Sequence, residues 1–381
     1  MHYAIVTETY PPEINGVALT VQSLEQGLRA RGHRVSLVRP RQDREAWADT
    51  GQTLVQGIGL PGYPGLRAGL PAGGRLARLW RRTPPDAIYI ATEGPLGWAA
   101  LRAARSLGIR VATGFHTRFD SYMRDYRLPW MAPVAWAWMR RFHNQADATL
   151  VPTHALQHDL RARGFQRVRV LARAVDTRLF DPARRCDALR ARLGVARHAP
   201  LVIHVGRLAA EKNLTLALTA FDKLAAHRPD ARMVFVGDGP LRARLQRDNP
   251  TCVFAGSLRG TALARLFASA DLFLFPSLSE TFGNVTLESM ASGVPVVAYD
   301  YGAAREHLRD GVHGAAIACG DESAFVAASV ALGRDMDRLR EMGAAARAAV
   351  ASLSPRRVAE DFDHILAGLG AMEDRHVDHA A

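Results

Sequence analysis

Two glutamates, Glu280 and Glu288, stand eight residues apart around the expected junction of a strand and a helix. The apolar run Leu272–Phe275 predicts a buried strand, and Gly283 is expected near the start of the helix. Free amide N–H groups at such a helix start favour an anion such as a phosphate. Carboxylates beside an anion site need another partner, and sugar hydroxyls are suitable ones. The pattern therefore suggests a nucleotide-sugar site.

A second set of chemically useful residues follows the apolar run Leu201–Val205. Arg207 and Lys212 lie in the loop after this expected strand, and they provide a planar guanidinium and a point charge. When a nucleoside diphosphate leaves a sugar, negative charge grows on its phosphate oxygens, and cations in a water-excluded site stabilise that charge. Lys212 is one of only two lysines in the chain, so it stands out among the arginines.

The elements that position these residues follow an α/β pattern. The expected strands Tyr3–Thr7 and Arg34–Val38 are joined by a helix over 17–31, and this order implies a parallel sheet. Gly16, just before that helix, permits close approach of a diphosphate. His116 follows the carboxyl end of another expected strand, where ligands of open α/β sheets bind.

The chain length and the repeated pattern predict two domains. At 381 residues there is room for two hydrophobic cores. An arginine-rich helix and turn over 181–198 has no strand character, and the α/β pattern restarts after it. We therefore expect an N-terminal domain over 1–180 and a C-terminal domain over 181–354.

Composition excludes several classes of protein. With 48% apolar and 23% charged residues the chain is globular, and no apolar run is long enough for a transmembrane helix. The first residues lack the pattern of a secretory signal. Three cysteines without metal-ligand spacing indicate a reducing compartment. We expect a cytoplasmic protein.

The net charge of +12 belongs to the first half of the chain. Residues 1–180 hold 25 arginines against 13 acidic residues, so the remainder of the chain is balanced. Such asymmetry predicts that one half faces an anionic surface. Residues 119–142 place tyrosines and tryptophans among arginines, which suits a membrane interface. A helix pair packed on the domain core is an equally weighted alternative.

Together these motifs resemble those of retaining glycosyltransferases of the GT-B fold, family GT4. The Gly206–Asn213 loop resembles the phosphate-binding loop of that family, and Glu280 with Glu288 resembles its acidic signature. The stretch Glu8–Gly16 resembles GDP-mannose-dependent α-mannosyltransferases and glycolipid-forming glucosyltransferases. The implied fold is α/β, with two Rossmann-like, doubly wound parallel-sheet domains facing across a cleft. A C-terminal helix over 355–370 would pack back on the first domain.

The resemblance also implies roles for individual residues. Glu280 would contact hydroxyls of the donor sugar, and Glu288 would contact the ribose. The implied catalytic residues are His116, Arg207, Lys212 and Glu280. The implied donor-binding residues are Gly16, Leu258, Phe282, Gly283, Asn284, Val285 and Glu288. Because Gly16 and His116 belong to the other domain, activity would depend on closure of the cleft.

The expected function is transfer of a hexose, with mannose favoured, from a nucleotide sugar to a lipid or lipid-linked glycan. The departing phosphate would act as the base in a same-face attack. Neither a cofactor nor a metal is expected, and no nucleic acid, because no recognised binding motif accompanies the basic charge. Peripheral association with the inner face of the cytoplasmic membrane is a further expectation. Alternatives are a UDP-sugar-dependent glucosyltransferase making glycolipid, an epimerase or phosphorylase, and a non-enzymatic nucleotide-sugar sensor.

Two acidic pairs have metal-like spacing, Asp335 with Asp337 and Asp361 with Asp363. Both pairs fall in expected helices, where residues i and i+2 face apart. We therefore expect these carboxylates to lie on solvated helix faces.

Overall fold

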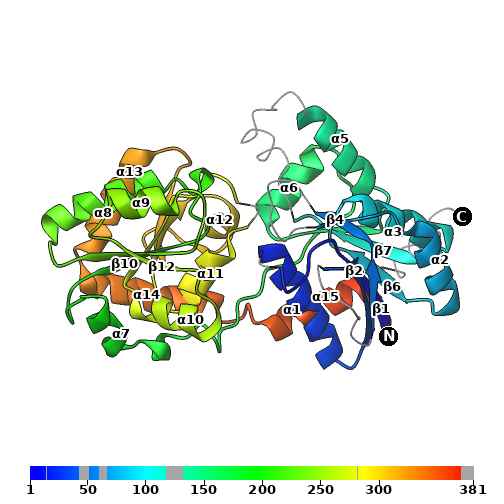
Figure 1. Cartoon of the computed structure of the whole chain (residues 1–381), viewed down its shortest axis with the longest axis horizontal. Coiled ribbons are helices and arrows are strands. Elements are labelled where there is room, and N and C mark those ends of the chain that lie inside the picture. Colours follow the sequence, from blue (N-terminus) through cyan, green and yellow to red (C-terminus); the bar gives the residue numbers. More distant parts are fainter. Residues whose placement is uncertain (14, 43–50, 60–66, 117–131, 281, 370–381) are drawn as a thin grey trace, which may run out of the picture. The chain divides into compact units, whose positions relative to one another are not determined.

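The computed structural model describes residues 1–13, 15–42, 51–59, 67–116, 132–280 and 282–369 (Figure 1). The chain divides into two compact units, unit 1 (Met1–Ala174 with Pro355–Ala381) and unit 2 (Val175–Ser354). The division comes earlier than the expected boundary at residue 180. The reason is that Val175 and Phe180 pack in the hydrophobic core of unit 2.

Unit 1 contains a seven-stranded parallel sheet in the order β3-β2-β1-β6-β7-β8-β9. Its strands are β1 (His2–Val6), β2 (Arg34–Pro40), β3 (Gln52–Val55), β6 (Ala87–Ile90), β7 (Arg110–Gly114), β8 (Ala148–Val151) and β9 (Val168–Val170). A separate antiparallel pair joins β4 (Gly57–Gly59) to β5 (Arg67–Gly69). The sequence did not predict β3, β4 or β5.

Helices cover both faces of this sheet. They are α1 (Gly16–Ala30), α2 (Gly73–Arg82), α3 (Pro95–Ser106), α5 (Ala132–His143), α6 (His154–Ala162) and α15 (Pro355–Ala367). Tyr3 and Ile5 of β1 share a core cluster with α1 and α15, whereas Ala4 and Val6 share one with α2 and α3. Alternate side chains of a strand point to opposite faces, so the sheet is doubly wound.

Helix α15 lies beside α1 in unit 1 (Figure 1), where Asp363 anchors it. Asp363 is 7% exposed, and its carboxylate accepts hydrogen bonds from Tyr3 Oη (2.7 Å), His33 Nε2 (2.9 Å) and Arg31 Nε (3.0 Å). The expectation that Asp363 lies on a solvated helix face is therefore wrong. Its partners are more than 300 positions away in the chain, so local spacing could not reveal them.

Unit 2 contains a six-stranded parallel sheet in the order β12-β11-β10-β13-β14-β15. Its strands are β10 (Leu201–Val205), β11 (Arg232–Val236), β12 (Val253–Gly256), β13 (Leu272–Phe275), β14 (Val296–Tyr299) and β15 (Gly314–Ile317). Its helices are η2 (Pro182–Arg184), α7 (Asp187–Arg192), η3 (Ala210–Lys212), α8 (Leu214–His227), α9 (Arg242–Asp248), α10 (Gly260–Ser269), α11 (Asn284–Ala291), α12 (Gly302–His307), α13 (Glu322–Gly333) and α14 (Met336–Val350). The sequence did not predict β15.

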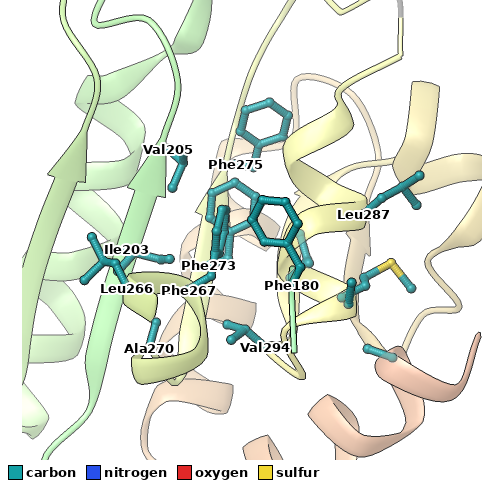
Figure 2. Packing of buried hydrophobic residues seen from close by; sticks show 14 of the residues in the cluster. Phe180, Ile203, Val205, Leu266, Phe267, Ala270, Phe273, Phe275, Leu287 and Val294 are labelled. Atoms are coloured by element: carbon teal, nitrogen blue, oxygen red, sulfur yellow. The ribbon is translucent and has the colours of Figure 1, made fainter. Parts of the chain in front are cut away.

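Aromatic packing holds the two central strands of this sheet in place. Figure 2 shows Phe180, Phe267 and Phe273 gathered in the core, with ring centroids 6.0 Å apart for Phe180 and Phe267 and 5.6 Å apart for Phe267 and Phe273. Strands β10 and β13 are parallel neighbours, paired through Val202 and Leu272. The loops that follow these strands therefore leave the sheet at the same edge.

No helix among the described residues is both long and apolar enough to cross a membrane.

Candidate active site

The structure brings Lys212 and Glu280 into contact at the carboxyl edge of the unit 2 sheet. Lys212 ends the short η3 helix after β10, and Glu280 lies in the loop after β13. Lys212 Nζ forms an ion pair with Glu280 Oε1, and the two side chains are 14% and 17% exposed. This pair places a cation and an anion side by side, in a position that still reaches solvent.

Ser277 and Tyr301 hold the pair in place. The Ser277 hydroxyl is buried, donates to Glu280 Oε1 (2.8 Å) and accepts from Lys212 Nζ (3.4 Å). The Ser277 carbonyl accepts from the Tyr301 hydroxyl at 2.6 Å. The next amide, that of Leu278, donates to the carbonyl of Glu211 at 2.9 Å. Two loops and the start of α12 therefore fix the carboxylate.

The start of α11 presents backbone donors near this pair. Gly283 precedes the helix with φ of 91°, a left-handed conformation that glycine adopts without strain. Amide N–H groups of Gly283, Asn284 and Val285 donate to no other described residue. With the partial positive charge of the helix start, they can donate hydrogen bonds to a phosphate oxygen. Arg207, exposed in the loop after β10, is a further cation at this edge.

Glu288 lies on the second turn of α11 and is half-buried. Burial raises the pKa of its carboxyl group to about 7. The described residues include no ion pair or hydrogen bond of its side chain with Lys212 or Glu280, so it is a separate polar group. Near pH 7 this carboxyl group is populated in both protonation states. Its ionised form accepts hydrogen bonds from hydroxyls, and its protonated form can donate one.

Two other expected donor-binding residues serve the core as well. Phe282 is buried, its ring lies edge-on to that of His307, and its carbonyl accepts from Ala303 N at 2.6 Å. Leu258, in the loop after β12, packs partly against the unit 2 core. The role of Leu258 in donor binding stays a prediction. Thr281, between Glu280 and Phe282, lies outside the described residues.

In unit 1, His116 is buried at the carboxyl end of β7 and uses both ring nitrogens. Nδ1 accepts from Arg173 Nη2 at 2.5 Å, and Nε2 lies 2.8 Å from Tyr89 Oη. Arginine only donates, so the neutral ring carries its proton on Nε2 and donates it to Tyr89. Burial, then the charge of Arg173 and the neighbouring His143, hold the pKa of His116 well below its usual value. His116 is therefore a neutral ring fixed in one tautomer.

Gly16 is exposed as the first residue of α1, after the helix cap formed by Asn15, whose side chain accepts from Ala18 N at 2.8 Å. Its approach to a diphosphate stays a prediction. Of the aromatic segment over 119–142, residues up to 131 lie outside the described chain, and the remainder forms most of α5.

Sequence reasoning missed four residues that support these sites: Ser277, Tyr301, Tyr89 and Arg173. Ser277 lies three positions before Glu280, and a small hydroxyl so close to a candidate carboxylate is the signal that the sequence offers. The other three are distant from their partners in the chain, and only the fold brings them together.

Comparison with known proteins gives two family matches. Residues 14–179 match the model described as "Glycosyltransferase Family 4", and residues 199–335 match "Glycosyl transferases group 1". The two spans fall in the two halves of the chain, and the second span includes the loops of both Lys212 and Glu280.

Relatives and solved structures agree with these matches. The chain is 37% identical over 80% of its length to a GDP-mannose-dependent alpha-mannosyltransferase of Mycobacterium tuberculosis, covering 80% of that protein. It is 24% identical over 78% of its length to an alpha-monoglucosyldiacylglycerol synthase of Streptococcus pneumoniae, covering 71% of that protein. The crystal structure of HepE from Anabaena in complex with UDP is similar in fold, with a TM-score of 0.77 and 19% identity, over 97% of this chain and all of the other.

Proposed function

The chain belongs to glycosyltransferase family 4, and from that premise we propose that it transfers mannose from GDP-mannose to a lipid or lipid-linked glycan with retention of configuration. Its GT-B fold class, expected from sequence, is confirmed by the two doubly wound parallel sheets and by the likeness to solved structures. As a member of this family it is a hexosyltransferase.

The observation that carries the mechanism is the contact between Lys212 and Glu280 beside the start of α11. Lys212, Arg207 and the N–H groups at the start of α11 are suited to hold a diphosphate and to stabilise the charge that grows as it leaves. Glu280 is suited to accept hydrogen bonds from sugar hydroxyls, and Glu288 from those of the ribose. A catalytic role of His116, which lies in unit 1, stays a prediction.

The choice of donor rests on the relatives. Mannose and GDP are supported by the GDP-mannose-dependent relative at 37% identity. A glucosyltransferase that makes a glycolipid is the second candidate, supported by the more distant diacylglycerol synthase. Thermal-shift measurements with GDP-mannose and UDP-glucose separate the two, because a bound ligand raises the unfolding temperature according to its affinity.

Association with an anionic membrane is supported by the surface of α5. Val134 and Trp138, four positions apart on one helix face, are 65% and 52% exposed. Arg140 and Arg141 follow them, whereas Met139 packs inward. Exposed apolar side chains next to arginines suit the boundary of an anionic bilayer. At low salt the wild type should sediment with anionic vesicles, and Trp138→Ala should sediment with them more weakly. If neither protein sediments with the vesicles, the proposal of membrane association is wrong.

We also propose that transfer needs no divalent metal, because Arg207, Lys212 and the N–H groups of α11 provide the positive charge that a metal would supply. Chelation by EDTA should leave the rate unchanged. A loss restored by Mg²⁺ or Mn²⁺ contradicts this statement.

The experiment that tests the proposed function is transfer from radiolabelled GDP-mannose to a membrane lipid extract. Wild type should label a lipid product. Lys212→Ala and Glu280→Ala should each lower turnover by at least about tenfold, equivalent to about 1.4 kcal/mol of transition-state stabilisation. Near-normal rates in both variants would remove the assignment of this site.

A further inference from the structure

Arg173 is a buried cation in unit 1, and the described residues place no carboxylate in an ion pair with it. Its side chain follows β9, and the residue is 9% exposed. Among the described residues its guanidinium makes one hydrogen bond, from Nη2 to His116 Nδ1, and no ion pair. Burial lowers the pKa of Arg173, as expected for a charge that its surroundings do not compensate. Arginine nevertheless stays protonated, and the described residues offer its remaining N–H donors no protein acceptor.

In the part of the chain that the structure describes, the titratable groups around Arg173 do not supply the missing negative charge. His116 and Tyr89 are neutral, since burial lowers the pKa of the first and raises the pKa of the second. His143 is neutral because burial lowers its pKa to about 3. Glu93, whose charge influences Tyr89, has its pKa raised to about 8 by burial, so it is mostly protonated at pH 7. An unpaired buried charge is costly, and a bound anion would remove the cost.

The position of Arg173 suits a ligand site. Strands β7, β8 and β9 are parallel neighbours, with His116 after β7 and Arg173 after β9. Ligands of open α/β sheets bind at this carboxyl edge. The planar fork of a guanidinium matches a phosphate or carboxylate, and the bond to His116 holds that fork in one orientation.

We propose that Arg173 binds an anionic oxygen group of a substrate, a phosphate or a carboxylate, and that His116 and Tyr89 are the positioning residues that hold it. In this role His116 acts through Arg173 rather than by direct contact. The anion has two possible sources, the diphosphate of the donor and an anionic group on the acceptor. The inference rests on the proposed function only for the choice of GDP as one probe.

Two binding measurements on the full chain test this inference with Arg173→Gln. The first is the dissociation constant of GDP by calorimetry. The second is the rise in unfolding temperature caused by inorganic phosphate when GDP already saturates the protein. Weakening of GDP binding by about tenfold or more assigns the anion to the donor. An unchanged GDP affinity with loss of the phosphate effect assigns it to the acceptor side. If neither measurement changes, the inference is wrong.

Control variants separate anion binding from net charge and from folding. Arg178→Gln removes the same charge from an exposed position five residues further along the chain and should change neither measurement. An equal effect in this variant contradicts the inference. Arg173→Lys serves as the second variant if Arg173→Gln folds poorly. It keeps the charge, so it should retain part of the anion binding. The double variant His116→Ala with Arg173→Gln should bind the anion as strongly as Arg173→Gln alone, because His116 acts only through Arg173. If the two substitutions lower the affinity additively, the positioning role of His116 is wrong. Failure of wild type to bind GDP refutes the proposed donor but leaves the phosphate measurement decisive here.

Discussion

Replacement of Glu280 by glutamine should tighten the binding of free GDP while it slows sugar transfer. In the structure Lys212 is paired with Glu280, and both side chains are largely buried. A diphosphate that binds Lys212 must share or break that pair and must also approach the carboxylate. The amide of Glu280→Gln keeps the shape and can still accept hydrogen bonds from Ser277 and Lys212, but it has no charge.

The size of the effect follows from the position of the pair. Two unit charges about 4 Å apart attract by about 4 kcal/mol at an effective dielectric constant of about 20. Most of this is offset by the loss of hydration, so the net contribution of a partly buried pair is about 1–2 kcal/mol. Free GDP should therefore bind about 5- to 30-fold more tightly to Glu280→Gln.

Calorimetric titration with GDP at fixed ionic strength measures this change. Turnover of GDP-mannose by the same variant should fall by about tenfold or more, because the sugar loses a charged acceptor. Glu211→Gln, which removes an acid from the loop of Lys212 without touching the pair, is the matched control. Unchanged or weaker GDP binding by Glu280→Gln refutes the reasoning that the pair competes with the diphosphate.

Further predictions concern pH, positioning and stability. Burial raises the pKa of Glu288 to about 7, and this pKa should fall when the carboxylate accepts hydrogen bonds from ribose hydroxyls. The affinity for GDP-mannose, measured by calorimetry, should therefore rise with pH up to about 7 and level off above it. Glu288→Gln should show no such rise. Ser277→Ala should lower kcat by about tenfold, with the fold intact by circular dichroism, since Glu280 loses a 2.8 Å hydrogen bond; an unchanged kcat contradicts a positioning role. Asp363→Ala should reduce the free energy of unfolding by about 3–5 kcal/mol, measured by denaturant titration, because buried partners such as Tyr3 lose their acceptor; a change below about 1 kcal/mol contradicts this anchor.

The central strands could be predicted from sequence because their side chains are buried on both faces. Leu201–Val205 and Leu272–Phe275 are continuous apolar runs, and both form strands of the unit 2 sheet. The missed strands lie at sheet edges and carry weaker signals. β3 begins with Gln52 and Thr53, and β15 reads Gly-Ala-Ala-Ile, with little of the β-branched or aromatic character on which strand prediction depends.

Some residues of the candidate site could be predicted from sequence, and others could not. Lys212 and Glu280 could be named in advance because each belongs to a local motif, and the pairing of β10 with β13 then brings them together. The bond between His116 and Arg173 joins residues 57 positions apart, and no local pattern encodes it. Asp363 was misjudged for this reason too, since helix spacing describes one element and says nothing of what packs against it.

The release of mannose from GDP-mannose, followed by proton NMR on the purified protein, tests the central claim most directly. Glycosyltransferases of this kind should hydrolyse their donor slowly when no acceptor is present. Wild type should release mannose first as the α anomer, as retention requires, and Lys212→Ala and Glu280→Ala should each be at least about tenfold slower. Absence of hydrolysis with GDP-mannose, or equal rates in wild type and both variants, would contradict the account.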